Sequence, residues 1–347
     1  MSNTSIPISV LDLVPVSSGS TPSDALRNTI DLARRVDTLG YRRYWLAEHH
    51  NMPGIASSTP EIVIGQVARE TSNLRVGSGG VMLPNHTPLK VAEAFQTLEA
   101  LFPGRIDLGI GRAPGTDPRT AVALRRTVDL NADKLPDMLT EMFAFATPTS
   151  DEVDSPRKAV AAYPAASLPP VYLLGSSDFS ALLAAERGLG YAFAYHINPE
   201  AAASMYAYRE AFRPSTDGRG FSEPHSILTV SAICAETADE AEYLASSAAL
   251  VMLLLPRGKR VTIPSPEEAL AYPYNEYDRE EMARNRHRVL VGDAGSVWNR
   301  IVDLAERTRA DEVMITTIVH DHAARVRSYD LLADRAGLGH REGRRLG

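Results

Sequence analysis

The sequence predicts a single (β/α)8 barrel domain, and three observations support this prediction. Short apolar runs alternate with amphipathic segments along the chain of 347 residues. The first four apolar runs begin near residues 6, 42, 74 and 105, a spacing of about 30–36 residues that suits repeated βα units. The turn after the first run, Val14-Pro15-Val16-Ser17, lacks the glycines that a dinucleotide-binding sheet places there. The closed barrel is therefore favoured over an open doubly wound sheet.

The first half of the chain carries clear start and stop signals for its elements. Strands are predicted over residues 6–14, 44–47, 74–83 and 105–111. The first helix begins at Thr21-Pro22-Ser23-Asp24, which supplies an N-cap, a proline at the first helical position and an acid three residues after the cap. Gly40 ends this helix, and Pro103-Gly104 ends the third. The second and third helices begin at Thr59-Pro60 and Thr87-Pro88.

The second half of the chain continues the repeat with two long insertions. Strands are predicted over residues 170–174, 191–195, 226–234 and 311–317. The insertion after the fourth strand, residues 131–169, holds an extra helix over 131–145 and a proline- and alanine-rich loop from 147. The insertion after the seventh strand, residues 256–292, is rich in charge, proline and tyrosine. Such long excursions form lids or walls of active sites. We expect the second to be a lid, with a plain surface insertion as the alternative.

Composition excludes several classes of protein. The 36 basic and 43 acidic residues give a net charge of −7, which argues against nucleic acid or an anionic membrane as the main partner. The longest apolar run, residues 248–255, is far shorter than the roughly 18 residues of a membrane span. The N-terminal segment lacks the basic start of a secretory signal. The single cysteine excludes an internal disulfide and a cysteine-rich metal site. These features predict a cytoplasmic enzyme.

Glycines gather at the ends of the third and fourth strands, where a barrel places its active site. They are Gly77, Gly79, Gly80, Gly109 and Gly111. Glycine weakens a strand, so five glycines at two neighbouring strand ends indicate a structural or functional requirement. One interpretation is a bulge or close packing of the chain. The other is a flat ligand that lies directly on the backbone, where side chains would clash.

A phosphate site is predicted at the end of the fifth strand. Gly175-Ser176-Ser177 precedes a helix that begins at Asp178, so backbone N–H groups and two hydroxyls converge at a positive helix terminus. Arg112, at the end of the neighbouring fourth strand, can add a guanidinium fork. The alternative is a simple helix cap by Ser176 or Ser177.

Histidines stand at several other strand ends. Glu48-His49-His50 ends the second strand, and His196, His320 and His322 follow the sixth and eighth. Metallohydrolase barrels use a His-x-His at the end of the first strand, but this chain has Asp12 there, so no metal site is predicted. Adjacent residues of a strand point to opposite faces, so only one of His49 and His50 can face the barrel mouth. An imidazole that titrates near neutral pH would serve there as an acid–base or hydrogen-bonding group.

Taken together, the strand ends resemble those of the bacterial luciferase-like flavin-dependent monooxygenase family. The pieces that carry the resemblance are Trp45-Leu46-Ala47-Glu48-His49-His50, residues 76–84, residues 104–112, Leu174-Gly175-Ser176-Ser177 and Ala310-Asp311-Glu312-Val313-Met314. The resemblance implies a (β/α)8 barrel that binds reduced FMN and uses dioxygen to oxygenate a small organic substrate. It also implies a separate flavin reductase as partner and a homodimer. Some family members tailor natural products, including polyketides.

The resemblance also assigns roles to individual residues. His49 matches the catalytic histidine near the flavin. Gly79-Gly80 matches a place where the family often has a non-prolyl cis peptide or bulge against the flavin ring. Gly111 stands where the light-emitting members carry a reactive cysteine, so light emission is not expected. The predicted cofactor-binding residues are Gly79, Gly80, Gly111, Arg112, Gly175, Ser176 and Ser177. A deazaflavin-dependent dehydrogenase and a non-catalytic flavin-binding protein remain alternatives.

Overall fold

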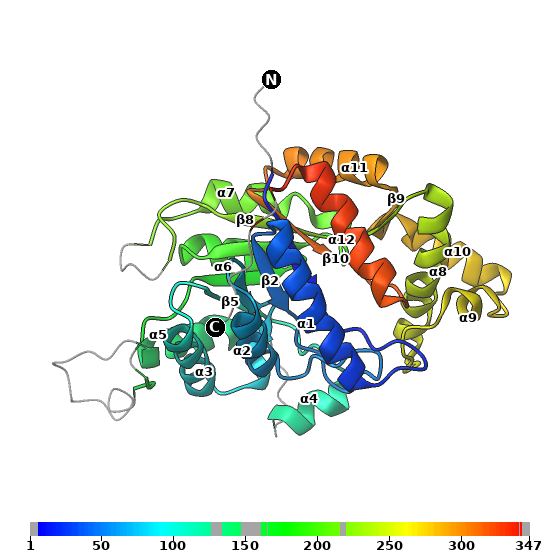
Figure 1. Ribbon diagram of the computed structural model, residues 1–347. Coiled ribbons are helices and arrows are strands. Elements are labelled where there is room, and N and C mark those ends of the chain that lie inside the picture. Colours follow the sequence, from blue (N-terminus) through cyan, green and yellow to red (C-terminus); the bar gives the residue numbers. More distant parts are fainter. Residues whose placement is uncertain are drawn as a thin grey trace.

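Eight parallel strands close into a barrel, and helices surround it (Figure 1). The computed structural model describes residues 6–125, 134–146, 161–164, 166–215, 220–339 and 341. The ring closes because β10 pairs with β1 on one side and with β8 on the other. The (β/α)8 prediction is therefore confirmed. The strands of the ring are β1 (Ile8–Asp12), β2 (Arg43–Leu46), β3 (Arg75–Ser78), β5 (Ile106–Gly111), β6 (Val171–Gly175), β7 (Gly190–Ala194), β8 (Ser226–Ala235) and β10 (Glu312–Thr316).

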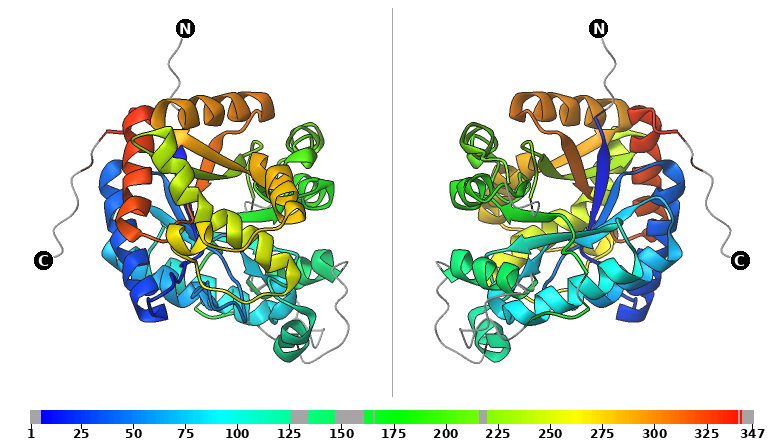
Figure 2. Two further views of the ribbon diagram at one scale, coloured as in Figure 1. Left: turned by 90° about the vertical axis from the view of Figure 1, so that its right-hand side faces the viewer. Right: turned by 90° about the vertical axis from the view of Figure 1, so that its left-hand side faces the viewer.

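Helices surround the ring (Figure 2), and most of them pack apolar side chains against its outward-facing residues. The first helix shows how the sequence sets these elements, since Thr21 and Asp24 form a capping box and Gly40 ends it with a φ of 89°. The helices are α1 (Pro22–Leu39), α2 (Pro60–Glu70), α3 (Pro88–Leu101), α4 (Pro118–Arg125), α5 (Leu135–Ala146), α6 (Asp178–Glu186), α7 (Ser204–Ala211), α8 (Ala238–Leu254), α9 (Pro266–Leu270), α10 (Glu276–Asn285), α11 (Ala294–Thr308) and α12 (His322–Ala336). Short 3₁₀ turns are η1 (Leu83–Asn85), η3 (Pro199–Ala201), η4 (Leu255–Arg257) and η5 (Arg286–Arg288).

The third predicted strand, residues 74–83, is wrong as one continuous element. It is divided into β3 and a short β4 (Val81–Met82), with the cis peptide bond between Gly79 and Gly80 in between. β3 pairs with the first half of β5, and β4 pairs with its end at Ile110 and Gly111. The cis bond lies where the family resemblance implies one.

The second insertion contains a strand that the sequence analysis missed. β9 (Val289–Asp293) pairs with residues 231–235 of β8 and extends the sheet outside the ring. The rest of this insertion forms α9 and α10, which lie beside α8 on one side of the barrel (Figure 2). In the first insertion the extra helix is α5, while residues 131–133 and 147–160 of that prediction lie outside the described residues.

The barrel interior is closed at one end and accessible at the other. Near the N-terminal ends of the strands, buried Arg43, Asp107 and Glu312 form ion pairs. Above them Leu11, Trp45, Tyr172, Ala192, Ile227 and Met314 form an apolar layer. Side chains at the C-terminal ends are only half-buried, so this end is the mouth of the barrel. No helix of the described residues is long and apolar enough to cross a membrane.

Candidate active site

His49 lies on the inner side of the chain that continues from β2. Arg43, Trp45 and Ala47 point into the barrel, and His49 continues their alternation. Its backbone N–H donates to the Ser57 carbonyl at 2.9 Å. The side chain is half-buried, and its Nδ1 is a buried atom without a hydrogen-bond partner among the described residues. The continued alternation favours His49 over His50 as the residue that faces the mouth, and this assignment stays a prediction.

The imidazole of His49 is held in its neutral form. Burial lowers the pKa of His49 to about 4. Attraction to the Glu48 carboxylate raises this pKa only in part, and repulsion from His50 and His196 lowers it further. At pH 7 the ring therefore carries no charge. This differs from the near-neutral titration that the sequence analysis expects, because the low polarity of the mouth disfavours the imidazolium ion.

Glu48 organises two further histidines beside the mouth. One oxygen of its buried carboxylate accepts hydrogen bonds from Nε2 of His50 and from Nε2 of His86, both at 2.8 Å. The other oxygen accepts from the backbone N–H of Met82 at 2.9 Å. Burial raises the pKa of Glu48, but the hydrogen bonds from His50 and His86 outweigh burial and lower that pKa to about 2. Burial lowers the pKa of His86, but its hydrogen bond to Glu48 raises it above its ordinary value overall. His50 thus supports the wall of the mouth, and His86 is a neighbour that the sequence analysis missed.

Close packing accounts for the glycines of the third and fourth predicted strands. A Cβ atom on Gly77 would lie 2.5 Å from the Asp107 carbonyl oxygen, and one on Gly80 would lie 2.7 Å from the Gly109 carbonyl oxygen. A Cβ on Gly109 would collide with the Ser78 carbonyl. β3 and β5 thus approach too closely for side chains. The packing interpretation is supported, and a flat ligand on this surface stays a prediction.

Gly79 and Gly111 are crowded by side chains instead of backbone. A Cβ on Gly79 would lie 2.5 Å from Leu11 Cδ1, and one on Gly111 would lie 2.6 Å from Met82 Sδ. Gly175 is similar, because a Cβ there would lie 2.6 Å from Ser180 Cβ. These glycines therefore fit the packing of the mouth whether or not a cofactor lies over them.

Arg112 is fixed beside the N-terminus of α6. Its guanidinium carbon lies 4.4 Å from the ring centroid of Phe179, the second residue of that helix. Within the described residues no carboxylate pairs with Arg112. β5 pairs with β6. Arg112, which follows β5, therefore lies beside the start of α6, which follows β6. A positive charge that no carboxylate of the described residues neutralises is thus held at a positive helix terminus.

Ser177 occupies the N-cap position of α6, but its side chain makes no capping hydrogen bond. The simple-cap interpretation is therefore not supported for Ser177. The preceding residue is held through its backbone, since the Ser176 carbonyl accepts from Nδ2 of Asn198 at 2.9 Å. Both hydroxyls and the first N–H groups of α6 remain available to an anionic ligand. Arg112 and the segment from Gly175 to Ser177 thus both lie beside the start of α6, and their role in binding a phosphate stays a prediction.

The remaining histidines have separate local partners. Nδ1 of His196 lies 3.2 Å from the Thr229 carbonyl. Nε2 of His320 lies 3.1 Å from the Ser18 carbonyl, and Nε2 of His322 lies 2.9 Å from Asp31. Across the described part of the chain, no group of three or more His, Cys, Asp or Glu residues is arranged to hold a metal ion.

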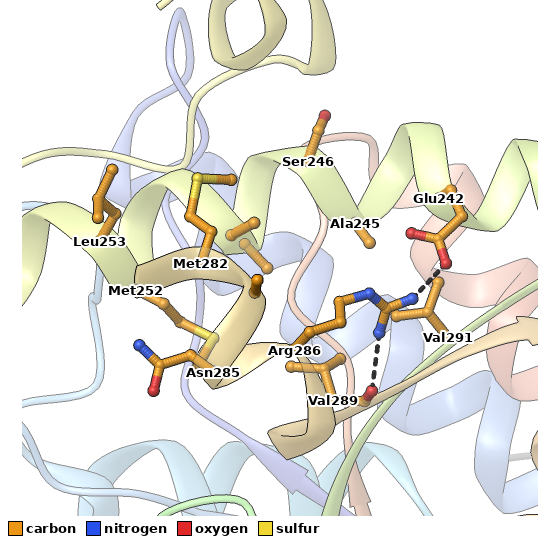
Figure 3. A pocket seen from close by; sticks show the side chains of 13 residues that line it. Glu242, Ala245, Ser246, Met252, Leu253, Met282, Asn285, Arg286, Val289 and Val291 are labelled. Atoms are coloured by element: carbon orange, nitrogen blue, oxygen red, sulfur yellow. Dashed lines mark hydrogen bonds and ion pairs between the residues drawn. The ribbon is translucent and has the colours of Figure 1, made fainter. Parts of the chain in front are cut away.

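An apolar cavity of about 300 Å³ lies outside the ring, between α8, α10 and β9 (Figure 3). Met252, Met282 and Val291 contribute to its lining, and the ion pair of Arg286 with Glu242 stands at its edge. None of the residues around His49 or α6 lines it. This cavity is therefore separate from the barrel mouth.

The fold and the mouth together define the class of protein: a (β/α)8-barrel enzyme whose polar groups stand at the C-terminal ends of the strands. Within that class, the chain belongs to the luciferase-like monooxygenase family, whose model matches residues 6–312.

Individual relatives match over nearly the whole chain. A luciferase-like monooxygenase of Escherichia coli (strain K12) is 39% identical over 336 residues, which cover 96% of this chain and 98% of the relative. The N-acetyl-S-alkylcysteine monooxygenase of Bacillus subtilis (strain 168) is 33% identical, with 95% and 98% covered. The crystal structure of apo-MsnO8 is similar with a TM-score of 0.88 at 38% identity, and it covers 97% of this chain and 100% of that chain.

More distant structures share the fold alone. The oxygenating constituent of 3,6-diketocamphane monooxygenase of Pseudomonas putida, in complex with FMN, has a TM-score of 0.68 at 19% identity over 95% of this chain and 97% of that one. An F420-dependent secondary alcohol dehydrogenase has a TM-score of 0.63 at 16% identity, with 94% and 99% covered. Barrels of this shape thus bind FMN in one case and a deazaflavin in another.

Proposed function

We propose that this protein is an FMN-dependent monooxygenase, which uses reduced FMN and dioxygen to oxygenate a small organic substrate. The observation that carries the proposal is the site at the start of α6. There Arg112, which has no carboxylate partner among the described residues, meets a helix N-terminus whose N-cap residue, Ser177, makes no capping hydrogen bond with its hydroxyl. A terminal phosphate satisfies each of these groups at once.

The residues of the mouth fit the two ends of FMN. Arg112, Ser176 and Ser177, with the chain at Gly175, would hold the phosphate. Gly79, Gly80 and Gly111 would border the ring, and the half-buried imidazole of His49 would lie beside it. Bound reduced FMN supplies the two electrons and the atom at which dioxygen reacts.

The protein's own groups control protons and water around that reaction. The neutral imidazole of His49 can accept or donate one proton at a ring nitrogen. Partly exposed apolar side chains at the mouth, among them Leu13 and Leu174, would be covered by cofactor and substrate and so exclude water. The buried Glu48, fixed by His50 and His86, keeps the wall beside His49 in place.

The test is an anaerobic titration of the protein with reduced FMN and with reduced riboflavin, which lacks the phosphate. Arg112→Ala should weaken binding of FMN by about 2 kcal/mol, or roughly thirtyfold, since one charge-assisted hydrogen-bonding group is lost. The affinity for riboflavin should not change. Arg119→Ala is the matched control, because Arg119 is an exposed arginine of α4. Equal affinity of the Arg112 variant and the wild type for FMN would contradict the phosphate site.

Admission of oxygen to the reduced complex separates the remaining alternatives. A monooxygenase consumes oxygen and transfers one of its atoms to a substrate, which mass spectrometry with ¹⁸O₂ detects. Tighter binding of a reduced deazaflavin, without oxygen uptake, would instead support the dehydrogenase. A protein that binds FMN but turns over no substrate in a broad screen would be the non-catalytic relative.

The resemblance also implies a homodimer, a separate flavin reductase and, for some members, a role in polyketide tailoring, and the composition predicts a cytoplasmic location. These four points remain predictions. The name of the Bacillus subtilis N-acetyl-S-alkylcysteine monooxygenase supports a small organic molecule as the substrate class.

A further inference from the structure

His196 stands directly across the mouth from His49. The ring order places three strands between β2 and β7 on either side, namely β3, β5 and β6 on one and β1, β10 and β8 on the other. Strands so related are opposite each other in an eight-stranded barrel. His49 follows β2 and His196 follows β7. Repulsion from His196 is one of the causes that lower the pKa of His49.

A hydrogen bond fixes which nitrogen of His196 carries the proton. Nδ1 lies 3.2 Å from the Thr229 carbonyl oxygen on β8, and the backbone N–H of His196 donates to the same oxygen at 3.4 Å. A carbonyl oxygen only accepts, so Nδ1 must be the protonated nitrogen. Burial lowers the pKa of His196, so the ring is neutral at pH 7. In that tautomer Nε2 is an acceptor, and it has no partner within the described residues.

The surroundings of this acceptor offer little to a charged ligand. Glu48, the nearest carboxylate to His49, already accepts three hydrogen bonds, from His50, His86 and the Met82 backbone. Arg112 is held on Phe179 at the start of α6. A carboxylate in front of Nε2 would meet a lone pair of the ring, and an ammonium ion would lose water without gaining a counter-charge.

We propose that His196 contacts the substrate as a hydrogen-bond acceptor through Nε2, and that the part of the substrate it contacts is uncharged and carries an O–H or N–H group. The inference rests on the proposed function, because it takes the barrel mouth as the place of oxygenation. His49 and His196 would then bracket the substrate from opposite sides of the ring.

The first experiment reads the tautomer without any ligand. Nitrogen NMR of the ¹⁵N-histidine-labelled protein at pH 7 should show His196 protonated on Nδ1 and free on Nε2. The signals of His196 are assigned as those that are missing from the spectrum of His196→Phe. A His196 ring protonated on Nε2 would overturn the proposal, since that nitrogen would then donate instead of accept.

The second experiment measures which chemistry the acceptor selects. The probes are 4-propylphenol, its methyl ether 4-propylanisole, and 4-propylbenzoate. We expect the phenol to bind about tenfold more tightly than the ether, as one hydrogen bond to a neutral group predicts, and to shift the His196 Nε2 signal. His196→Phe should lose this preference, and His196→Gln, which keeps an acceptor, should retain part of it. Equal binding of phenol and ether, or tighter binding of the benzoate, would overturn the inference.

A control variant separates this inference from the proposed function. His225 is also half-buried with a pKa lowered by burial, but it lies near Glu312 at the closed end of the barrel and stacks on Phe221. His225→Phe keeps the stacking and should keep the preference for the phenol. Affinity for reduced FMN should be the same in both variants and the wild type. Failure to bind FMN would count against the proposed function, whereas loss of discrimination in the wild type would count against His196.

Discussion

His49 owes its neutral state to burial, because the neighbouring carboxylate is occupied elsewhere. Glu48 accepts hydrogen bonds from His50, His86 and the Met82 backbone, so it cannot also hold a proton-bearing His49 in place. Nδ1 of His49 is covered by protein atoms and has no hydrogen-bond partner among the described residues, so a ligand would meet the other ring nitrogen, Nε2. At the scale of single residues, the mouth thus separates a structural set (Glu48, His50 and His86) from a reactive one.

We expect His49→Ala to keep the fold and the affinity for reduced FMN but to uncouple the reaction. Oxygen uptake should continue while hydrogen peroxide replaces oxygenated product, because no group then controls the proton beside the flavin. Loss of such a group lowers the product-forming rate by roughly 10²–10⁴-fold. Parallel assays of oxygen uptake, peroxide and product check this. Full coupling in His49→Ala together with uncoupling in His50→Ala would move the role to His50.

The pKa of His49 also predicts how stability depends on pH. Its value in the folded protein is about 4, below the ordinary 6.5, so the unfolded chain binds more protons between these values. Its contribution to stability is therefore complete above pH 6.5 and is lost as the pH falls towards 4. Glu48, with a pKa of about 2 instead of 4.5, adds a second loss below pH 4.5.

The corresponding measurement is urea unfolding of the wild type and His49→Phe between pH 7 and 4.5. Over this range the wild type should lose about 2 kcal/mol more than the variant, since the variant has no imidazole to protonate. Identical pH profiles above 4.5 would show that His49 titrates normally in the folded protein.

At the scale of elements, sequence signals identify the eight ring strands because each βα unit carries its own apolar run and caps. The break between β3 and β4 lies at Gly79-Gly80, within an apolar run that contains no other stop signal. β9 has only Val289, Leu290 and Val291 as its apolar run and lies outside the ring, so the repeat does not predict it. The contact of Glu48 with His86 depends on the position of β4 and η1, which no local pattern contains.

The second insertion is tied to the loops that border the mouth. Ile263 exchanges backbone hydrogen bonds with Val16 and Ser18 at 2.9 and 2.8 Å. Arg260 donates to Asn51 at 2.9 Å and pairs with Asp117 at 3.4 Å. These links join the insertion to the loops after β1, β2 and β5, and they involve few groups. An element held to the mouth in this way is suited to open and close.

We therefore predict that residues 256–265 gain protection from hydrogen exchange when reduced FMN and substrate bind. Arg260→Ala should raise exchange of this segment in the free protein, because it removes the links to Asn51 and Asp117. Helix α12, on the outside of the barrel, serves as the internal control, and its exchange should not change. Equal protection of residues 256–265 in the free and bound protein would leave this insertion as a surface feature.

At the scale of the whole molecule, the two ends of the barrel differ in how their charged and polar side chains are paired. At the mouth, Arg112 has no carboxylate partner and Nε2 of His196 has no hydrogen-bond partner within the described part of the chain, and both are proposed to contact ligands. The opposite end satisfies its charges internally. Asp107 accepts from Arg43 at 2.7 Å, from Trp45 at 3.1 Å and from Arg75 at 2.6 Å, and Arg43 also donates to Glu312 at 3.0 Å. Function is thus built at one end, and stability depends on the other.

Asp107→Asn tests this division of the molecule. Asp107 is fully buried, and the substitution removes the carboxylate that pairs with Arg43 and Arg75. Removing one partner from a buried ion pair costs about 3–5 kcal/mol, whereas an exposed pair contributes about 0–1 kcal/mol. Asp303→Asn is the matched control, because Asp303 pairs with Arg307 on α11 with both side chains more than half exposed. Urea unfolding should show the large loss in Asp107→Asn alone, while titration with reduced FMN should give the wild-type affinity for both variants, since neither residue borders the mouth. Equal destabilisation by the two changes, or a loss of FMN affinity in Asp107→Asn as large as that in Arg112→Ala, would show that the two ends are not separate.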